Sequence, residues 1–247
     1  MPEASQNSSL LANAQPGRIG LLLGRLLALG YRITGKYRYD DYRLERVGTM
    51  PILVLPSVAN PKLLRTGAWF ASLLNERVIR QEASVLDLGT GSGVCALFVA
   101  RHASGVVGTD INPAAVRCAK INALINGVDA RIEFLQGDLF APVQHRRFDV
   151  ILFNPPFLIG TPTNDRDAAW RGSDVARRFA GELSDHLESD GTALVLLSSF
   201  GDASAAFEKE LSRRGFGLDL FAQRRFVNET LSVLRVTPPT GNLGNTA

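Results

Sequence analysis

The tetrapeptide Asn154-Pro155-Pro156-Phe157 has the composition of a rigid hydrogen-bond acceptor. Pro155 and Pro156 fix φ and carry no backbone N–H, so carbonyl oxygens dominate this stretch. The Asn154 side chain and the Pro155 carbonyl can both accept hydrogen bonds from an NH₂ group, and Phe157 offers a face for a flat molecule. A planar amide or exocyclic amine held in this way would present its nitrogen for attack on an electrophile. The alternative is a plain turn after a strand, for which Asn-Pro-Pro is also typical.

A glycine-rich turn lies upstream of this tetrapeptide. Gly89, Gly91 and Gly93 recur at every second position after Asp87. Glycines permit a tight strand-to-helix turn and the close approach of a ligand to the backbone. The apolar residues before the turn predict a buried strand, and those after it predict a helix whose first N–H groups are free. The turn therefore predicts a site for a nucleoside cofactor, to which Thr90 also belongs.

Two kinds of nucleoside cofactor fit this glycine spacing. The segment from Gly91 to Ala96 satisfies the looser dinucleotide fingerprint. Asp87 favours S-adenosylmethionine instead, because a carboxylate would repel a pyrophosphate but can bind the ammonium of a methionine moiety. A dehydrogenase also has no use for the tetrapeptide that begins at Asn154.

Two further acids follow predicted strands. Asp110, with Ile111 after it, lies about 20 residues beyond the loop, where an acid accepts hydrogen bonds from ribose hydroxyls. Asp138 can hold the adenine amino group while Leu139 lies against the ring. The alternatives are a helix N-cap for Asp110 and an ordinary turn residue for Asp138. We therefore expect the cofactor to contact Asp87, Gly89, Thr90, Gly91, Asp110, Ile111, Asp138, Leu139 and Asn154.

This order of motifs resembles the class I S-adenosylmethionine-dependent methyltransferases between about Ser84 and Phe157, with weaker similarity as far as Val236. Residues 168–179 and 229–235 are similar to the HemK-type release-factor glutamine methyltransferases. The resemblance implies a Rossmann-like fold and methyl transfer from S-adenosylmethionine to a planar amide or exocyclic amino nitrogen. It also implies that the acceptor is held by Asn154, Pro155, Pro156 and Phe157.

The acceptor itself stays open. A protein glutamine of a release-factor-like substrate is the first expectation. An rRNA or tRNA base is an alternative, because Phe157 is similar to the phenylalanine common in the ribosomal-RNA guanine branch. A small-molecule amine or amide is another. From a different functional class, the chain could be a non-catalytic methyltransferase-fold subunit that binds RNA or protein.

Alternating strand-like and helix-like segments over residues 48–239 predict a mostly parallel sheet with helices on both faces. The last two strand-like segments lie close in sequence, which predicts a C-terminal antiparallel hairpin. We expect seven strands, over residues 84–88, 105–109, 131–135, 148–153, 192–197, 218–222 and 230–236. Helices are expected over residues 62–75, 93–102, 113–126, 174–187 and 203–214.

The two ends have a different character from this domain. Residues 1–15 read as a disordered tail, and residues 240–247 as a flexible C-terminus. Residues 16–47 form a basic, amphipathic extension in which Arg18, Arg25 and Arg32 would share one face of a helix. This extension predicts either a helix that docks on the domain or an RNA contact through phosphates and stacked bases.

The composition sets broad limits on function. A net charge of +3 over 247 residues does not by itself identify a nucleic-acid binder. Cys95 and Cys118 fit no disulfide framework and no metal spacing, so we expect buried thiols, no metal, and a reducing, cytoplasmic compartment. No apolar stretch is long enough to span a bilayer. Trp69 is expected in the core or the cleft wall, and Trp170 as a residue able to cover the acceptor site.

Overall fold

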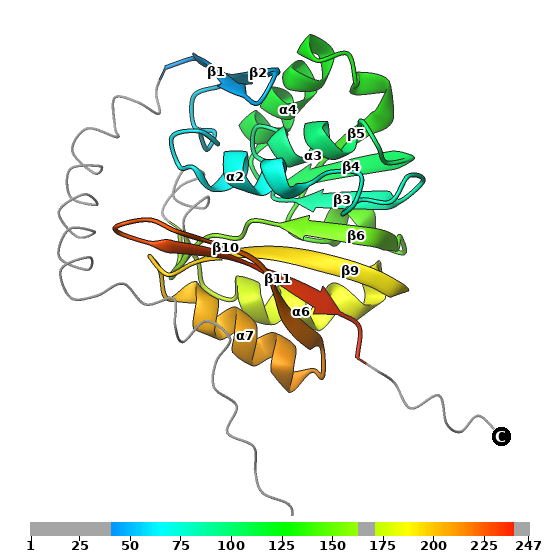
Figure 1. The fold of residues 1–247 in the computed structure, drawn as a ribbon, viewed down its shortest axis with the longest axis vertical. Helices are drawn as coiled ribbons and strands as arrows, with labels where there is room; N and C mark the ends of the chain where they lie inside the picture. The colour runs from blue at the N-terminus through cyan, green and yellow to red at the C-terminus, as the bar shows by residue number, and fades with distance from the viewer. Residues whose placement is uncertain (1–40, 163–170, 240–247) are drawn as a thin grey trace, which may run out of the picture.

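The computed structural model describes residues 41–162 and 171–239, so the expected helix in the basic extension and Trp170 lie outside the described residues. The centre of the molecule is a seven-stranded sheet in the order β10-β11-β9-β6-β3-β4-β5 (Figure 1). The strands are β3 (Ser84–Leu88), β4 (Gly105–Asp110), β5 (Ile132–Gln136), β6 (Phe148–Phe153), β9 (Leu187–Ser198), β10 (Gly217–Arg225) and β11 (Thr230–Thr237). Strand β11 pairs antiparallel with both β9 and β10, while the pairings among β3, β4, β5, β6 and β9 are parallel. The predicted fold class is confirmed.

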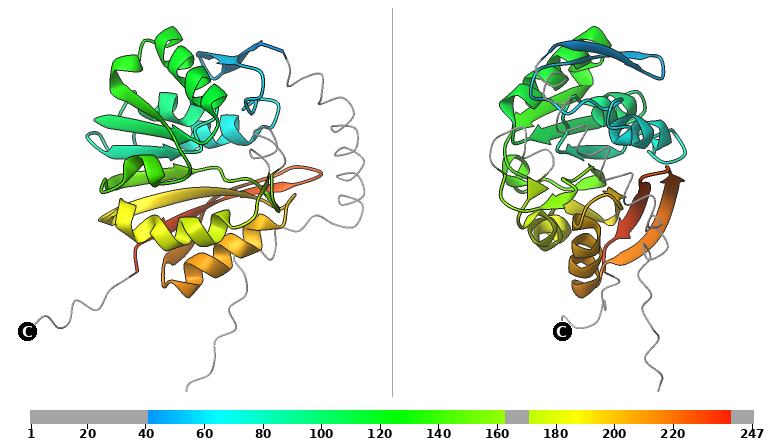
Figure 2. Two further views of the ribbon diagram at one scale, coloured as in Figure 1. Left: turned by 180° about the vertical axis from the view of Figure 1, so that it is seen from behind. Right: turned by 90° about the vertical axis from the view of Figure 1, so that its left-hand side faces the viewer.

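Helices cover both faces of this sheet, as the two views in Figure 2 show. The helices α2 (Thr66–Leu73), α3 (Val94–Val99) and α4 (Pro113–Ile125) lie on one face, and α6 (Val175–His186) and α7 (Ala203–Arg213) lie on the other. Side chains of the buried strands alternate between the two cores. Val150 and Leu152 of β6 pack with the first group of helices, whereas Ile151 and Phe153 pack with the second.

Helix α4 begins and ends where the sequence predicts. Pro113 occupies its first turn, and the Asn112 side chain accepts a hydrogen bond from the Ala114 N–H at 2.9 Å. Gly127, just beyond the helix, has φ +65°, the left-handed conformation that glycine adopts readily.

Several boundaries differ from the sequence prediction. Helix α2 is shorter than the expected 62–75, because residues 61–65 form turns stabilised by the Asn60 side chain, which accepts from the N–H groups of Lys62 and Leu63. Strands β9 and β10 are longer than expected, because long ladders to β6 and β11 extend them. Trp69 lies in α2 and is buried in the core.

The sequence reading missed two short strand pairs. One is β7 (Leu158–Ile159) with β8 (Arg171–Gly172), which pair in parallel next to the Asn-Pro-Pro-Phe segment. The other is the hairpin of β1 (Arg43–Val47) and β2 (Met50–Val54), which includes the expected start of the domain at residue 48.

A buried asparagine joins this hairpin to the domain. Asn122 of α4 is fully buried; its side-chain oxygen accepts from the Leu53 N–H at 2.7 Å. Its amide donates to the carbonyl of Leu53 at 2.7 Å and to that of Ser92 at 2.9 Å. One side chain therefore connects the β1–β2 hairpin, helix α4 and the glycine turn.

Two absences apply to the described part of the chain. Within it, no helix has the length and apolar character needed to cross a membrane. Across residues 41–162 and 171–239, no three His, Cys, Asp or Glu side chains gather as metal ligands would.

We predict that Asn122→Ala lowers the free energy of unfolding by about 2–4 kcal/mol, because it leaves buried backbone groups of Leu53 without partners. Chemical denaturation measures this change. Asn126→Ala is the matched control, since Asn126 is less buried and donates to the Pro51 carbonyl from the end of the same helix. A loss no larger at Asn122 than at Asn126 would contradict the assigned role.

Candidate functional site

The ends of four parallel strands meet at one edge of the sheet because their registers are matched. Leu88 of β3 lies opposite Thr109 of β4 and Phe153 of β6, and Asp110 of β4 lies opposite Gln136 of β5. The glycine turn, the two later acids and the Asn-Pro-Pro-Phe segment all follow directly from these positions. Ligands of open α/β sheets bind at this edge, where the strand order reverses, here between β3 and β6.

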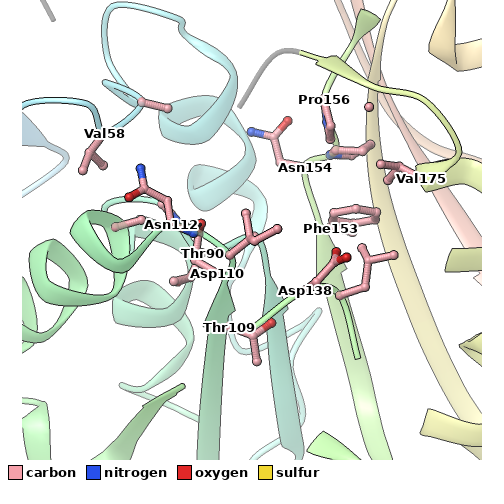
Figure 3. Close-up of a pocket in the computed structure, with 18 of the residues that line it drawn as sticks. Val58, Thr90, Thr109, Asp110, Asn112, Asp138, Phe153, Asn154, Pro156 and Val175 are labelled. Atoms are coloured by element: carbon pink, nitrogen blue, oxygen red, sulfur yellow. Dashed lines mark hydrogen bonds between the residues drawn. The ribbon is translucent and has the colours of Figure 1, made fainter. Parts of the chain in front are cut away.

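A cavity of about 310 Å³ opens at this edge (Figure 3). Its size is within the range of small-molecule sites. Of the predicted site residues, all but Asp87 line it: Gly89, Thr90, Gly91, Asp110, Ile111, Asp138, Leu139, Asn154, Pro155, Pro156 and Phe157.

The glycine turn has the conformation that its spacing predicts. Gly89, Gly91 and Gly93 have φ values of +66°, +57° and +83°. A Cβ atom on Gly93 would lie 3.0 Å from the Ala119 Cβ, so a side chain there would push α3 away from α4. The turn is fixed to the neighbouring strand, because the Thr90 N–H donates to the Thr109 carbonyl at 2.8 Å.

Asp87 lies beneath the turn. It is buried, and its Oδ2 accepts from the Thr90 hydroxyl at 2.6 Å and from the Ala96 N–H at 3.1 Å. Burial raises its pKa to about 6, against the opposing effect of these hydrogen bonds, and the nearby Asp110 raises it further. The structure thus shows Asp87 holding the turn; its contact with a cofactor stays a prediction.

Asp110 connects the turn to the start of α4. Its Oδ2 accepts from the Gly91 N–H at 2.8 Å, and its Oδ1 accepts from the Asn112 N–H at 2.9 Å. Burial raises the pKa of this carboxyl group. A carboxylate has about four lone-pair sites, so each oxygen can accept one more hydrogen bond from the cavity side.

The third loop is fixed in a constrained conformation. Leu139 has φ +48°, which is uncommon for a residue with a side chain. Gly137 has no room for a side chain, because a Cβ atom would lie 2.3 Å from the Pro142 Cγ. The Asp138 carboxylate accepts an ion pair from Arg178 of α6 at 2.8 Å.

Asn154 and the prolines form the opposite wall. Figure 3 shows the Asn154 side chain facing the part of the cavity where Thr90, Asp110 and Asn112 lie. The Asn154 Oδ1 is buried and has no hydrogen-bond partner within the described structure. An unsatisfied buried acceptor is costly and rare, and marks a place where a ligand donor can bind.

A loop after β9 supports this wall from behind. The Phe157 carbonyl accepts from the Ala203 N–H at 3.2 Å, and the Ile159 N–H donates to the Asp202 carboxylate at 2.7 Å. Gly201 lies so close that a Cβ atom would be 1.8 Å from the Phe157 oxygen. Phe157 is buried and packs with the core while it lines the cavity.

Sequence reasoning missed other residues of the cavity wall. On one side these are Val58, Leu64 and Thr66, and on the other Asp174 and Arg178. Ser57, which the sequence pattern did not place in the site, has φ +66° and accepts at its carbonyl from the Asn112 side chain at 3.0 Å. These residues precede or follow the recognised motifs and carry no spacing signal, so only the folded chain brings them together.

Comparison with known proteins is consistent with this geometry. Residues 64–215 match the family model "Methyltransferase small domain". A Methanocaldococcus jannaschii protein, provisionally named a protein N5-glutamine methyltransferase, is 35% identical over 174 residues, which cover 66% of this chain and 85% of that one. The release factor glutamine methyltransferase of Moorella thermoacetica is 42% identical over 150 residues, which cover 60% of this chain and half of the relative.

A solved structure supports the fold. The ribosomal protein L11 methylase of Lactobacillus delbrueckii subsp. bulgaricus aligns with a TM-score of 0.54 and 24% identity, over 75% of this chain and 84% of that one. The matched family segment contains the glycine turn, both later acids and the Asn-Pro-Pro-Phe segment. The chain belongs to the methyltransferase small domain family.

Proposed function

We propose that this protein transfers a methyl group from S-adenosylmethionine to the side-chain amide nitrogen of a glutamine in a protein. The observation that carries the proposal is the buried, unpartnered Oδ1 of Asn154, in the same cavity as the glycine turn. An acceptor N–H group would satisfy this oxygen. The names of both glutamine methyltransferase relatives support glutamine over other amides and amines.

The residues at the edge of the sheet fit S-adenosylmethionine. In the proposal, both Asp110 oxygens accept hydrogen bonds from the ribose hydroxyls, and Asp138 with Leu139 holds the adenine. The backbone of Gly89, Thr90 and Gly91 lies along the methionine part, with Ile111 beside the ribose. Asp87 contributes its negative charge beneath the turn, close to where the ammonium would lie. When bound, the cofactor supplies an electrophilic methyl group.

Asn154 and the Pro155 carbonyl orient the acceptor nitrogen. A primary amide is a poor nucleophile because its lone pair is delocalised into the carbonyl group. Two hydrogen bonds, one from each N–H, would hold the amide plane and increase electron density on nitrogen during attack. Pro156 and Phe157 close the wall behind it, and positioning of this kind can lower a barrier by roughly 7–11 kcal/mol. The proton leaves to water after attack, because the methylated nitrogen is strongly acidic.

The acceptor can be tested directly. The protein is incubated with methyl-labelled S-adenosylmethionine and a cell lysate, and the products are then treated separately with protease and ribonuclease. The proposal predicts label in protein, recovered as N5-methylglutamine after complete proteolysis. Label released by ribonuclease as a methylated base, or label only in small molecules, would overturn the glutamine assignment. Cofactor binding without any transfer would instead indicate a non-catalytic subunit.

We predict that Asn154→Ala lowers the rate of methyl transfer by about 10²–10³-fold, because the acceptor loses a preorganised hydrogen bond. The affinity for S-adenosylhomocysteine should change by no more than about twofold, since Asn154 contributes little to cofactor binding. Single-turnover kinetics and calorimetry measure the two effects. Asn75→Ala at an exposed position is the control. Equal losses of rate and affinity would show a structural role instead.

Asp110→Ala is expected to weaken S-adenosylhomocysteine binding by at least about tenfold, because hydrogen bonds to a charged group are worth roughly 1.5–3 kcal/mol each. The change also removes support for Gly91, so a second ligand separates the two effects. The 2′-deoxy analogue should lose much less affinity than the parent compound on this substitution. The same loss for both ligands would argue against ribose recognition.

The raised pKa of Asp87 predicts a pH-dependent stability difference between the wild-type protein and Asp87→Asn. The folded pKa of about 6 exceeds the ordinary 3.8, so the folded state binds this proton more tightly. The carboxylate therefore lowers the unfolding free energy fully above pH 6, by on the order of 3 kcal/mol, and this effect disappears as pH falls toward 4. Asp87→Asn should stabilise the cofactor-free protein at pH 7.5 more than at pH 4.5, as measured by denaturant unfolding. A difference independent of pH would refute the assignment.

A further inference from the structure

An ion pair joins two distant parts of the chain at the cavity wall. Asp138 follows β5, and Arg178 belongs to the first turns of α6 on the far side of the clamp segment. The Arg178 Nη2 lies 2.8 Å from the Asp138 Oδ2, and both residues line the cavity. Their side chains are partly exposed, at 32% and 45%, and pairs of this kind contribute little to stability. The pair is therefore better explained by what it does to the geometry of the site.

The backbone beneath Asp138 is already fixed. The crowded Gly137, the left-handed Leu139 and the hydrogen bond from the Ala141 N–H to the Asp138 carbonyl at 3.1 Å leave the loop one conformation. These constraints do not fix the carboxylate, which can still rotate about its side-chain bonds. The only hydrogen bond or ion pair of this carboxylate within the described residues comes from Arg178.

Arg178 is itself held in place. Its backbone N–H donates to the Asp174 carbonyl at 3.0 Å, and its Nη1 lies 3.9 Å from the Asp174 carboxylate. Asp174 follows β8, where Gly172 packs against Pro156: a Cβ atom on Gly172 would lie 3.4 Å from the Pro156 Cγ. Arg178 is thus anchored to the same segment that borders the acceptor wall.

We infer that Arg178 is a positioning residue that aims the Asp138 carboxylate at the amino group of the adenine ring and so makes the site selective for 6-aminopurines over 6-oxopurines. This inference rests on the proposed use of S-adenosylmethionine. With Oδ2 occupied by the guanidinium, Oδ1 is the oxygen left to accept a hydrogen bond from the N6 amino group. An ionised carboxylate only accepts hydrogen bonds, so it would repel the O6 of a hypoxanthine ring, which is also an acceptor.

The test compares two ligands of equal charge, S-adenosylhomocysteine and S-inosylhomocysteine, by calorimetry with the full chain. Because the ligands differ only at the purine 6-position, their affinity ratio cancels any general effect of removing a positive charge. The wild-type protein should prefer the adenosyl compound. Arg178→Gln should weaken adenosyl binding by about tenfold while leaving inosyl binding within about twofold, so the preference falls. Arg178→Lys, which keeps the charge but not the fork, should recover part of the preference.

Arg177→Gln is the matched control. Arg177 pairs with the same Asp174 at 2.8 Å but is more exposed and does not line the main cavity. Its replacement should leave the preference unchanged. Equal weakening of both ligands by Arg178→Gln, or an unchanged ratio in Arg178→Gln and Arg178→Lys, would overturn the inference while leaving the proposed function intact. Failure of the wild-type protein to bind S-adenosylhomocysteine would overturn both.

Discussion

The site depends on one constraint, the parallel pairing of β3 with β6 in a register that places Leu88 opposite Phe153. The glycine turn begins one residue after Leu88, and Asn154 follows Phe153. A register shift of one residue would turn both strands' side chains to the wrong faces, because the side-chain period of a strand is two residues. The alternation of Val150 and Leu152 with Ile151 and Phe153 between the two cores prevents such a shift. The same burial that stabilises the sheet therefore sets the distance between the cofactor turn and the acceptor wall.

At the edge of the sheet, precision comes from backbone groups that have few alternatives. Glycines in left-handed conformations shape the turn, and prolines stiffen the opposite wall. Side chains then add what the backbone lacks: Asp87 and Asp110 accept from the N–H groups of the turn and of α4, and the loop at Gly201 supports Phe157 from behind. This network leaves one buried acceptor, the Asn154 Oδ1, without a partner in the described structure. A site that satisfies its own polar groups except one has that one available for the substrate.

Much of this arrangement could be predicted from the sequence, because strong local signals coincide with it. The buried strand before Gly89, the Pro113 and Gly127 signals around α4, and the close spacing of the last two strands led to the confirmed sheet and hairpin. Local signals failed where long-range contacts decide. The β1–β2 hairpin is fixed by Asn122, 69 residues from Leu53, and nothing near residue 53 announces that contact. Arg178 and Gly201 belong to the site only because the folded chain brings α6 and the loop after β9 to the clamp segment. Asp87 was expected in the cavity, and the structure instead shows it bonded to the turn from below.

The central claim is that the orphaned oxygen of Asn154 receives the N–H of the methyl acceptor. A crystal structure of the protein with S-adenosylhomocysteine and a glutamine-containing peptide tests it most directly. The account predicts the glutamine amide nitrogen within about 2.7–3.2 Å of the Asn154 Oδ1, with the same nitrogen facing the sulfur of the cofactor product. A bound amide nitrogen beyond hydrogen-bond reach of Asn154, or an Asn154 side chain turned to bond with the protein instead, would contradict the account.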